Sequence, residues 1–559
     1  MYFGNSNVII PSAVAQDFEE EDVNLLNSRA SEAYEQGMYE ETIEYSDRVL
    51  AIDPDNLEAL NNKGKALNDL ERYEEAIRYL DRALAIEPND TDTLASIGDA
   101  LYYLGRYEEA ISYYDRVLAV SPDNAYVLAS IGDALIILNR YEEAIEYVDT
   151  ALAIEPDYVY ALNLKGLALA SLQRYQEAIE YYDRVLAIEP NFVNALHGKG
   201  DALYDLGRYE EAIEYYDRAL AIEPNDVYGL YSKANALASL ERYEESLEYY
   251  DRVLAIEPDN VIILYIKGLV LANLGRYEEA LTYYDRVLAI EPDNLDTLSR
   301  KGTALASLER YEESLEYYDR VLAIEPNDIA TLNDKGLLLD NLGRYEEAIE
   351  YYDRALAIEP NYAIVLYNKG NALYDLQRYQ EAIEYYDRAL AIEPDNVDAL
   401  NNKANAIGSL VDSIQQPVKF NNNDHTFVTP INYQLTTSIT TENQSSVILD
   451  LYQQRINEYD KALTISPNDP DILANKGIAL LDLSGLVDAP RYNEAIELFD
   501  QGLKVNPEHV ACLYNKGIVL EVFGRTDEAS QYKNMALDLD PTYGGETINK
   551  GSIGLQSPI

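Results

Sequence analysis

The sequence predicts an all-α protein, built as a solenoid of antiparallel helix pairs. Prolines recur every 34 residues over much of the chain, and the same seventeen residues occur at Arg208–Pro224 and Arg344–Pro360. Apolar residues within each period are spaced as on one face of a helix. A constant period of this length is typical of repeat architectures, in which each unit packs mainly on its neighbours.

The proline series defines fourteen repeats between about Val23 and Tyr543. Two of the later steps are longer than the others, which indicates an insertion in each. The prolines that close the repeats are Pro54, Pro88, Pro122, Pro156, Pro190, Pro224, Pro258, Pro292, Pro326, Pro360, Pro394, Pro467, Pro507 and Pro541.

The first part of each repeat is predicted to be a helix. After Pro88, the side chains of Asn89 and Asp90 offer oxygens to the free amides of a helix start. Gly105 suits the left-handed backbone that ends a helix. Between them, one apolar stripe with helical spacing is formed by Leu94, Ile97, Gly98 and Leu101.

A second helix is predicted from about Tyr107 to Val120, and Pro122 ends it. Along this helix in another repeat, Glu214 lies four residues before Arg218, a spacing that favours a weak ion pair. The second helix barely changes between repeats. Its apolar side is formed by Tyr107, Ala110, Ile111, Tyr114, Val117 and Leu118.

The composition limits the partners of this chain. Its formal net charge is −57 and its pI is near 4.2, so nucleic acid and anionic membrane surfaces are poor partners, whereas segments with Lys or Arg are favoured. No apolar run approaches the ~20 residues that span a bilayer, so no membrane insertion is expected. The one cysteine, Cys512, fits a reducing compartment, and a cytoplasmic location is therefore favoured.

The two ends of the chain lie outside the repeats. Residues 1–22 are predicted to be a disordered leader, and residues 544–559 a flexible tail. The leader contains Ala13-Val14-Ala15, which is similar to a signal cleavage site but lacks a basic start and a sufficient apolar run. The alternative is an exported protein whose signal sequence was truncated upstream of Ala15.

The repeats differ in regularity along the chain. Residues 23–396 are predicted to form eleven regular repeats, and residues 397–469 a twelfth that contains an insertion at 411–450. Residues 470–543 form two divergent repeats. The insertion is rich in Asn, Thr, Ser and Gln, and around Phe427–Ile439 it forms either a small hairpin or a disordered loop.

The segment Val159–Phe192, VYALNLKGLALASLQRYQEAIEYYDRVLAIEPNF, resembles the tetratricopeptide repeat family. The resemblance covers nearly the whole chain. Lysine often replaces a leucine before the glycine of the first helix, as at Lys63 and Lys199. The resemblance implies a right-handed superhelix of helix pairs whose concave groove binds extended peptides or partner helices. The positions that match the family are Leu162, Gly166, Leu169, Tyr175, Ala178, Tyr182, Val185 and Pro190.

The same resemblance places the variable face of the first helices inside the groove. On this face Tyr, Asn and Asp predominate, and they favour an extended segment that is basic or amphipathic. Alternatively, these positions vary only because little packs on them. The candidate partner-binding residues are Asp99, Tyr102, Tyr103, Asp133, Asn163, Asp201, Tyr204, Tyr231, Asn235, Tyr265, Asn333, Tyr367, Asn371, Tyr374 and Asn401.

Nothing in the sequence indicates catalysis, a cofactor or a metal site. The histidines His197, His425 and His509 lack the spacing of a helical zinc site, and no glycine-rich phosphate loop follows a strand. The repeated glutamates share one exposed setting, whereas acid–base catalysis needs two unlike ones. We therefore expect no enzyme.

Two functions follow from this interpretation. The first is a non-catalytic scaffold or adaptor that docks a peptide or partner protein in its groove. The alternative is a self-associating structural protein that uses its acidic outer face or the ends of the array. The sequence leaves the oligomeric state open.

Overall fold

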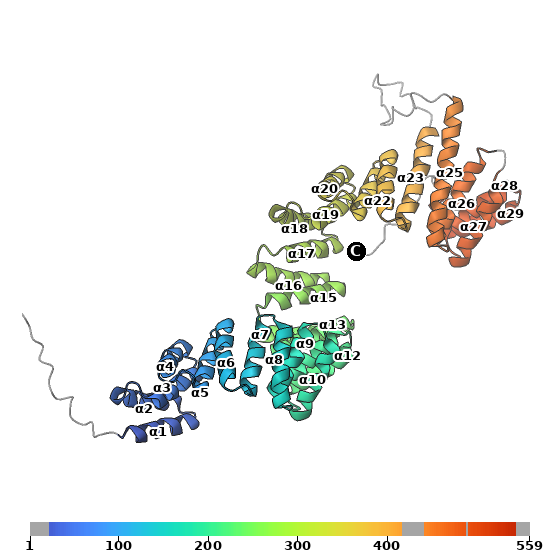
Figure 1. Ribbon diagram of the computed structural model, residues 1–559. Coiled ribbons are helices and arrows are strands. Elements are labelled where there is room, and N and C mark those ends of the chain that lie inside the picture. Colours follow the sequence, from blue (N-terminus) through green and yellow to red (C-terminus); the bar gives the residue numbers. More distant parts are fainter. Residues whose placement is uncertain (1–21, 416–440, 488–489, 544–559) are drawn as a thin grey trace, which may run out of the picture. The chain divides into compact units, whose positions relative to one another are not determined.

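The computed structural model describes residues 22–415, 441–487 and 490–543. The chain divides into an N-terminal half, which ends at Ile263, and a C-terminal half, which begins at Leu264. The described residues are helical with short turns and contain no strand, so the all-α prediction is confirmed. Within each half, helices follow one another in chain order (Figure 1).

Two helices form each repeat, and we call them the first and the second helix. In the N-terminal half the helices are α1 (Val23–Glu35), α2 (Tyr39–Ile52), α3 (Leu57–Asp69), α4 (Tyr73–Ile86), α5 (Thr91–Tyr103), α6 (Tyr107–Val120), α7 (Ala125–Ile137), α8 (Tyr141–Ile154), α9 (Val159–Ser171), α10 (Tyr175–Ile188), α11 (Val193–Asp205), α12 (Tyr209–Ile222), α13 (Val227–Ser239) and α14 (Tyr243–Ile256).

The boundary between the halves falls inside α15 (Val261–Asn273). The helices that follow are α16 (Tyr277–Ile290), α17 (Leu295–Ser307), α18 (Tyr311–Ile324), α19 (Ile329–Asn341), α20 (Tyr345–Ile358), α21 (Ala363–Asp375), α22 (Tyr379–Ile392), α23 (Val397–Gln415), α25 (Thr441–Ile465), α26 (Pro470–Ser484), α27 (Tyr492–Val505), α28 (Val510–Val522) and α29 (Thr526–Leu539).

Polar side chains start many of the first helices, as the sequence predicts. The Thr93 amide donates to the Asp90 carboxylate over 3.2 Å at the start of α5, and the Val127 amide donates to Asn124 over 3.1 Å at the start of α7. Tyr158 stands at this position before α9 and makes no such bond. The following first helix, α11, likewise lacks a side-chain cap.

The turn inside each of the eleven regular repeats has one residue with a positive φ. Glycine fills this position in several repeats, for example Gly105 at φ 74° and Gly207 at φ 74°. Other repeats place a side chain there, such as Asn139 at φ 60° and Glu241 at φ 59°. The turn is therefore set by the two helices that it joins, although glycine adopts it at a lower cost.

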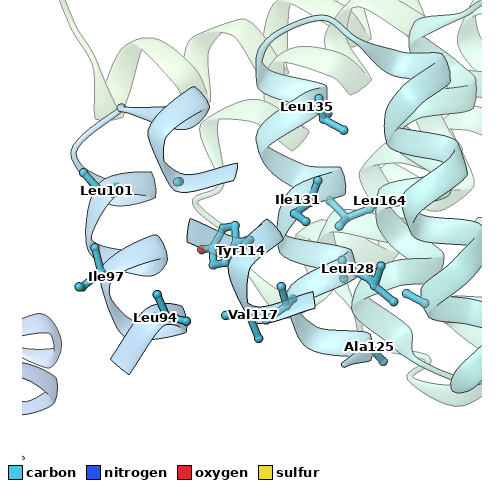
Figure 2. Close-up of a cluster of buried hydrophobic side chains, with 14 of the residues drawn as sticks. Leu94, Ile97, Leu101, Tyr114, Val117, Ala125, Leu128, Ile131, Leu135 and Leu164 are labelled. Atoms are coloured by element: carbon cyan, nitrogen blue, oxygen red, sulfur yellow. The ribbon is translucent and has the colours of Figure 1, made fainter. Parts of the chain in front are cut away.

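A close approach of the two helices forms the core of each repeat. A Cβ atom added to Gly98 would lie 2.4 Å from Cε1 of Tyr114, so the tyrosine ring packs directly on the glycine backbone. Figure 2 shows Tyr114 and Val117 of α6 between the apolar stripe of α5 and the apolar side chains of α7. The same contact joins Gly166 to Tyr182, whereas Leu80 and Val148 take the place of the tyrosine opposite Gly64 and Gly132.

Basic side chains connect consecutive repeats. Lys199 of α11 is buried, pairs with Asp183 of the preceding second helix, and lies 4.3 Å from the ring centroid of Tyr215. Arg218 donates to the backbone carbonyl of Pro190 over 3.1 Å. Arg218 is thus bonded to the preceding repeat. In this repeat the arginine–glutamate ion pair joins Arg208 to Glu211, over 2.6 Å. The structure therefore shows this pair in place of the expected pair of Arg218 and Glu214.

The twelfth repeat is longer in helix than the regular ones. Helix α23 continues to Gln415 and α25 begins at Thr441, so helical residues extend into both ends of the range 411–450. Val411 and Ile448 belong to one buried cluster. The hairpin or loop expected around Phe427–Ile439 lies outside the described residues, as do the expected leader up to residue 21 and the tail 544–559.

First helices of neighbouring repeats contact one another in each half, and together we call them the first layer. Such contacts join α7 to α9 and α9 to α11 in the N-terminal half, and α19 to α21 and α21 to α23 in the C-terminal half. The second helices form the other layer. We call the surface of the first layer that carries the fifteen candidate residues the first-helix face.

Candidate functional site

The candidate residues of the first-helix face are half-buried, apart from Tyr103, of which 67% is exposed. They therefore have definite neighbours, and they are not a set of loosely packed positions. The two halves of the chain carry separate parts of this face: the candidates from Asp99 to Asn235 lie in the N-terminal half, and those from Tyr265 to Asn401 lie in the C-terminal half.

Asp99 is held by two tyrosine hydroxyls. Tyr114, from the second helix of the same repeat, donates over 2.8 Å, and Tyr126, from the first helix of the next repeat, donates over 2.9 Å. Burial raises the pKa of Asp99, and the two hydrogen bonds oppose this rise. The carboxylate thus links two consecutive repeats through a pair of phenols.

Asp133 and Asp201 are also each held by two tyrosine hydroxyls, although both donors to Asp133 come from first helices, one of the preceding repeat and one of the following repeat. Asp133 accepts from Tyr102 over 2.7 Å and also from Tyr160. Asp201 accepts from Tyr216 over 2.8 Å and also from Tyr228. Because an ionised carboxylate has room for about four hydrogen bonds, these groups retain capacity for a further donor. The structure therefore brings predicted aspartates and tyrosines together, and part of their hydrogen-bonding capacity is used between them.

Asparagine replaces aspartate at the same position in other repeats. Asn235 accepts from Tyr250 over 2.6 Å, and Asn371 accepts from Tyr386 over 2.7 Å. Tyr204 and Tyr374 instead contact the serine of the next first helix: their hydroxyls lie 3.1 Å from Ser239 and Ser409, respectively.

In the C-terminal half the candidate residues are joined by amide hydrogen bonds between repeats. Asn333 accepts from Asn368 over 2.9 Å, and Tyr367 accepts from Asn402 over 3.0 Å. The side chain of Asn475 donates to Asn401 over 3.2 Å. These contacts form a polar ladder along consecutive first helices. The aromatic ring of Tyr265 lies 6.4 Å from the ring of Tyr284.

One predicted residue carries an unsatisfied polar atom. The side-chain oxygen Oδ1 of Asn163 is buried and has no hydrogen-bond partner. Buried polar groups of this kind are rare, so the Asn163 oxygen is an exception among the otherwise paired polar groups of this face.

Asp340 is a residue of this face that the sequence analysis did not select. Its Oδ1 atom is buried and accepts no hydrogen bond. Burial, and after it the charge of Asp375, raises the pKa of Asp340 from 3.8 to about 7. A signal was present in the sequence, because Asp340 is the aspartate that stands where other repeats place Tyr102, Tyr204 or Tyr374.

Two hollows lie at successive turns between repeats, away from the candidate residues. One is lined by Ile154, Tyr158 and Phe192, and the other by Ile188 and Phe192, with Glu189 on both. The sequence analysis missed them as well. Their signal is an aromatic residue, Tyr158 or Phe192, where other repeats have the capping aspartate or asparagine.

The described residues give little support for metal or nucleophile chemistry. Within residues 22–415, 441–487 and 490–543 no group of three or more His, Cys, Asp or Glu side chains is placed to hold a metal ion. Burial raises the pKa of the Cys512 thiol to about 12, so this cysteine is not a reactive thiolate near neutral pH. Over the same residues, no helix combines the length and apolar character needed to cross a bilayer.

The chain belongs to the tetratricopeptide repeat family. Models of this repeat match well over half of the sequence. The matched residues are 33–97, 96–159, 138–192, 163–227, 231–294, 293–361, 333–397 and 484–543. The resemblance inferred from the repeat pattern is thereby confirmed.

Solved structures of similar proteins include MamA (26% identity, TM-score 0.27), covering 29% of this chain and 88% of its own. YrrB, described as a tetratricopeptide repeat protein with an unusual peptide-binding site, has 27% identity and a TM-score of 0.30, covering 34% and 98%. The Cut9–Hcn1 complex of APC/C has 14% identity and a TM-score of 0.34, covering 92% and 96%. No match is found among curated protein sequences. Since these TM-scores are low, the family assignment depends on the repeat models.

Proposed function

We propose that this protein is a non-catalytic scaffold or adaptor that docks an extended, basic or amphipathic segment on its first-helix face. As a tetratricopeptide repeat protein it belongs to a class of protein-interaction scaffolds. The chemistry of the segment is the part that we add.

The observation that carries this proposal is the composition of the first-helix face. Half-buried aspartates, asparagines and tyrosines follow one another from repeat to repeat, and Asp99, Asp133 and Asp201 keep acceptor capacity after their tyrosine bonds. Exposed parts of Tyr103 and Tyr126 add rigid contact area. The net charge of −57 attracts a cationic segment.

A peptide titration tests the proposal. A four-fold Ser-Arg-Ala peptide and a four-fold Ser-Glu-Ala peptide are titrated into the full chain at low and at moderate salt. We expect binding of the basic peptide alone, with an affinity that persists at moderate salt. Tyr231→Ala and Tyr367→Ala should each weaken it by about tenfold.

Tyr113→Ala is the matched control, because Tyr113 is a half-buried tyrosine of the second-helix layer that lies beneath Arg116. It should leave the affinity within about twofold of the original. Equal binding of the two peptides, or equal effects of the three substitutions, would contradict the proposal.

Self-association is the second candidate, and one observation favours it. The last residue of the second helix is an exposed isoleucine in many repeats, with 50% of Ile52, 45% of Ile86 and 44% of Ile188 exposed in the N-terminal half. Such a row could bury apolar surface against another copy. Light scattering over a concentration series distinguishes the two functions: a constant monomer mass favours the adaptor, and a mass that grows with concentration favours assembly.

The remaining expectations stay predictions. They are the absence of catalytic residues, cofactors, metals and nucleic-acid partners, and the cytoplasmic location. The glutamates that open the second helices, such as Glu211, have their pKa lowered by a hydrogen bond from a neighbouring arginine, here Arg208. That environment supports a surface ion pair and not an acid–base group.

A further inference from the structure

We propose that Asp340, Asp375 and Tyr352 form a subsite for one lysine or arginine side chain of the docked segment. This inference rests on the proposed function and assigns a particular ligand group to a particular place. It concerns α19, α20 and α21, which lie in the C-terminal half and follow one another in the array (Figure 1).

The first reason is an unpaired carboxylate oxygen. Oδ1 of Asp340 is buried without a hydrogen-bond partner, although the charge of Asp375 acts on the same carboxylate. Burying charge without a partner is costly, and proteins normally compensate it with a cation or with donors. A cation from outside the chain would supply both.

The second reason is an unpaired hydroxyl next to it. Tyr352 is fully buried, and its hydroxyl has no partner. Its ring crosses Gly336 at the same close distance as in other repeats, with Cε1 2.5 Å from an added Cβ. Burial, and after it the charges of Asp340 and Asp334, raises the pKa of this phenol, so both carboxylates act electrostatically on it.

A comparison with the next repeat explains why this hydroxyl is free. There Tyr386 crosses Gly370 and donates to Asn371, the residue after the glycine. In the repeat of Tyr352 the residue after the glycine is Leu337, which cannot accept a hydrogen bond. Leucine at this position thus leaves the buried hydroxyl of Tyr352 without the acceptor that Asn371 provides in the next repeat.

Most of the groups that face the cluster are anionic or phenolic. On α19 itself Asp334 lies nearby, α20 contributes Tyr345, and α22 contributes Tyr386. Tyr318 of α18 is influenced by Asp334. Arg300 of α17 acts on Asp334, whereas Asp340 has its pKa raised by burial and by Asp375.

The donor set fits an organic cation better than a metal ion. No cluster of three metal-ligating side chains is formed in the described parts of the chain. An ammonium or guanidinium group needs only acceptors in suitable directions, and here Asp340, Asp375 and the oxygen of Tyr352 would provide them. A guanidinium group has enough N–H donors to form hydrogen bonds with both carboxylates at once.

The test uses the full chain and the four-fold Ser-Arg-Ala peptide at moderate salt, with a citrulline version of the peptide as a neutral probe. We expect Asp340→Asn to weaken binding of the arginine peptide by about tenfold and to leave citrulline binding unchanged. Leu337→Asn should also weaken it by about tenfold, because it gives Tyr352 an internal acceptor. Glu350→Gln removes an exposed charge from α20 in the same repeat and should change the affinity by less than about twofold.

The pH dependence gives a second readout. With Asp340 ionised, the subsite holds a cation; as the pH falls below about 7 the carboxylate takes up a proton, and affinity should fall by up to about tenfold per pH unit. In Asp340→Asn this dependence should be lost. Circular dichroism confirms that each variant keeps its helix content.

The outcomes separate the two levels of inference. If the original protein does not bind the arginine peptide, the proposed function fails and the subsite with it. If it binds, but Asp340→Asn, Leu337→Asn and the pH all leave the affinity unchanged, the subsite alone is wrong. Competition by millimolar Mg²⁺ that disappears in Asp340→Asn would also overturn it, in favour of a metal ion.

Discussion

Asp201 in the N-terminal half and Asp340 in the C-terminal half are both half-buried carboxylates on first helices, but their surroundings differ. Asp201 accepts hydrogen bonds from Tyr216 and Tyr228, which oppose the rise in its pKa that burial causes. One oxygen of Asp340 accepts none, and its pKa rises to about 7. The same residue type on the same layer is thus internally satisfied in one place and open in the other.

The difference depends on which residue follows the glycine of the first helix that packs against the second-helix tyrosine. Where that residue is Asp201 or Asn371, it receives the hydroxyl of the second-helix tyrosine. Where it is Leu337, the hydroxyl of Tyr352 stays unpaired. In these repeats, this one position therefore decides whether the hydroxyl of the second-helix tyrosine has a hydrogen-bond acceptor.

The largest effect is expected from Asp340→Asn. Because the folded protein raises the pKa of Asp340 from 3.8 to about 7, its contribution to stability is full below about pH 4 and is lost as the pH rises to about 7. The substitution should raise the free energy of unfolding by about 3 kcal/mol at pH 8, discounted for partial exposure, and leave it unchanged at pH 4. Hydrogen exchange of the α19 amides at both pH values measures this, and equal protection at pH 8 would contradict it.

A smaller loss is expected from Asp201→Leu, which imitates the repeat of Leu337. The hydroxyl of Tyr216, a residue that is only 1% exposed, would lose its acceptor. This should lower the free energy of unfolding by about 2 kcal/mol, measured by urea unfolding and by hydrogen exchange in α11 and α12. Asp201→Asn is the matched control and should cost less than about 1 kcal/mol, since Asn235 serves the same role. Equal losses in both variants would show that the hydrogen bond is not the cause.

The smallest effect is expected from Tyr228→Phe. Its hydroxyl also donates to Asp201, but 48% of this residue is exposed, so the loss should be only about 0.5 kcal/mol. The pKa of Asp201 should rise, because one of the hydrogen bonds that lower it is gone. Carboxyl NMR titration measures that pKa. A fall in the pKa would be incompatible with the arrangement of two donors.

The sequence was sufficient for the fold and for the scaffold of each repeat. Periodicity alone predicted the helix Tyr107–Val120, which is α6 in the structure. It also selected Asp90 as a capping residue, and the structure confirms the bond to Thr93. These features depend on residues close together in the chain, where spacing determines which side chains meet.

Contacts between repeats were harder to predict. A lysine often replaces the leucine before the glycine of the first helix, as at Lys199. This lysine can be buried because it pairs with Asp183 of the preceding repeat and lies over the ring of Tyr215 in its own repeat. Glu214 and Arg218 have a favourable helical spacing, but Arg218 instead donates a hydrogen bond to the carbonyl of Pro190, 28 residues earlier in the chain. Likewise, Asp340 is not among the fifteen candidate residues, because its character depends on Leu337 and Tyr352 together.

The ion pairs and hydrogen bonds that lysine and arginine form between repeats affect how such a chain can change in length. Lys199 pairs with Asp183 and Lys233 pairs with Asp217, so these contacts between repeats use the same pair of residues, whereas Ile97 and Ile131 stand at the lysine position in two other repeats. Any repeat that carries these groups is therefore an acceptable neighbour for any other. Among such repeats, removal or duplication of a block of 34 residues keeps the Lys–Asp contacts, and the array can be shortened or extended by whole repeats without new contacts having to arise.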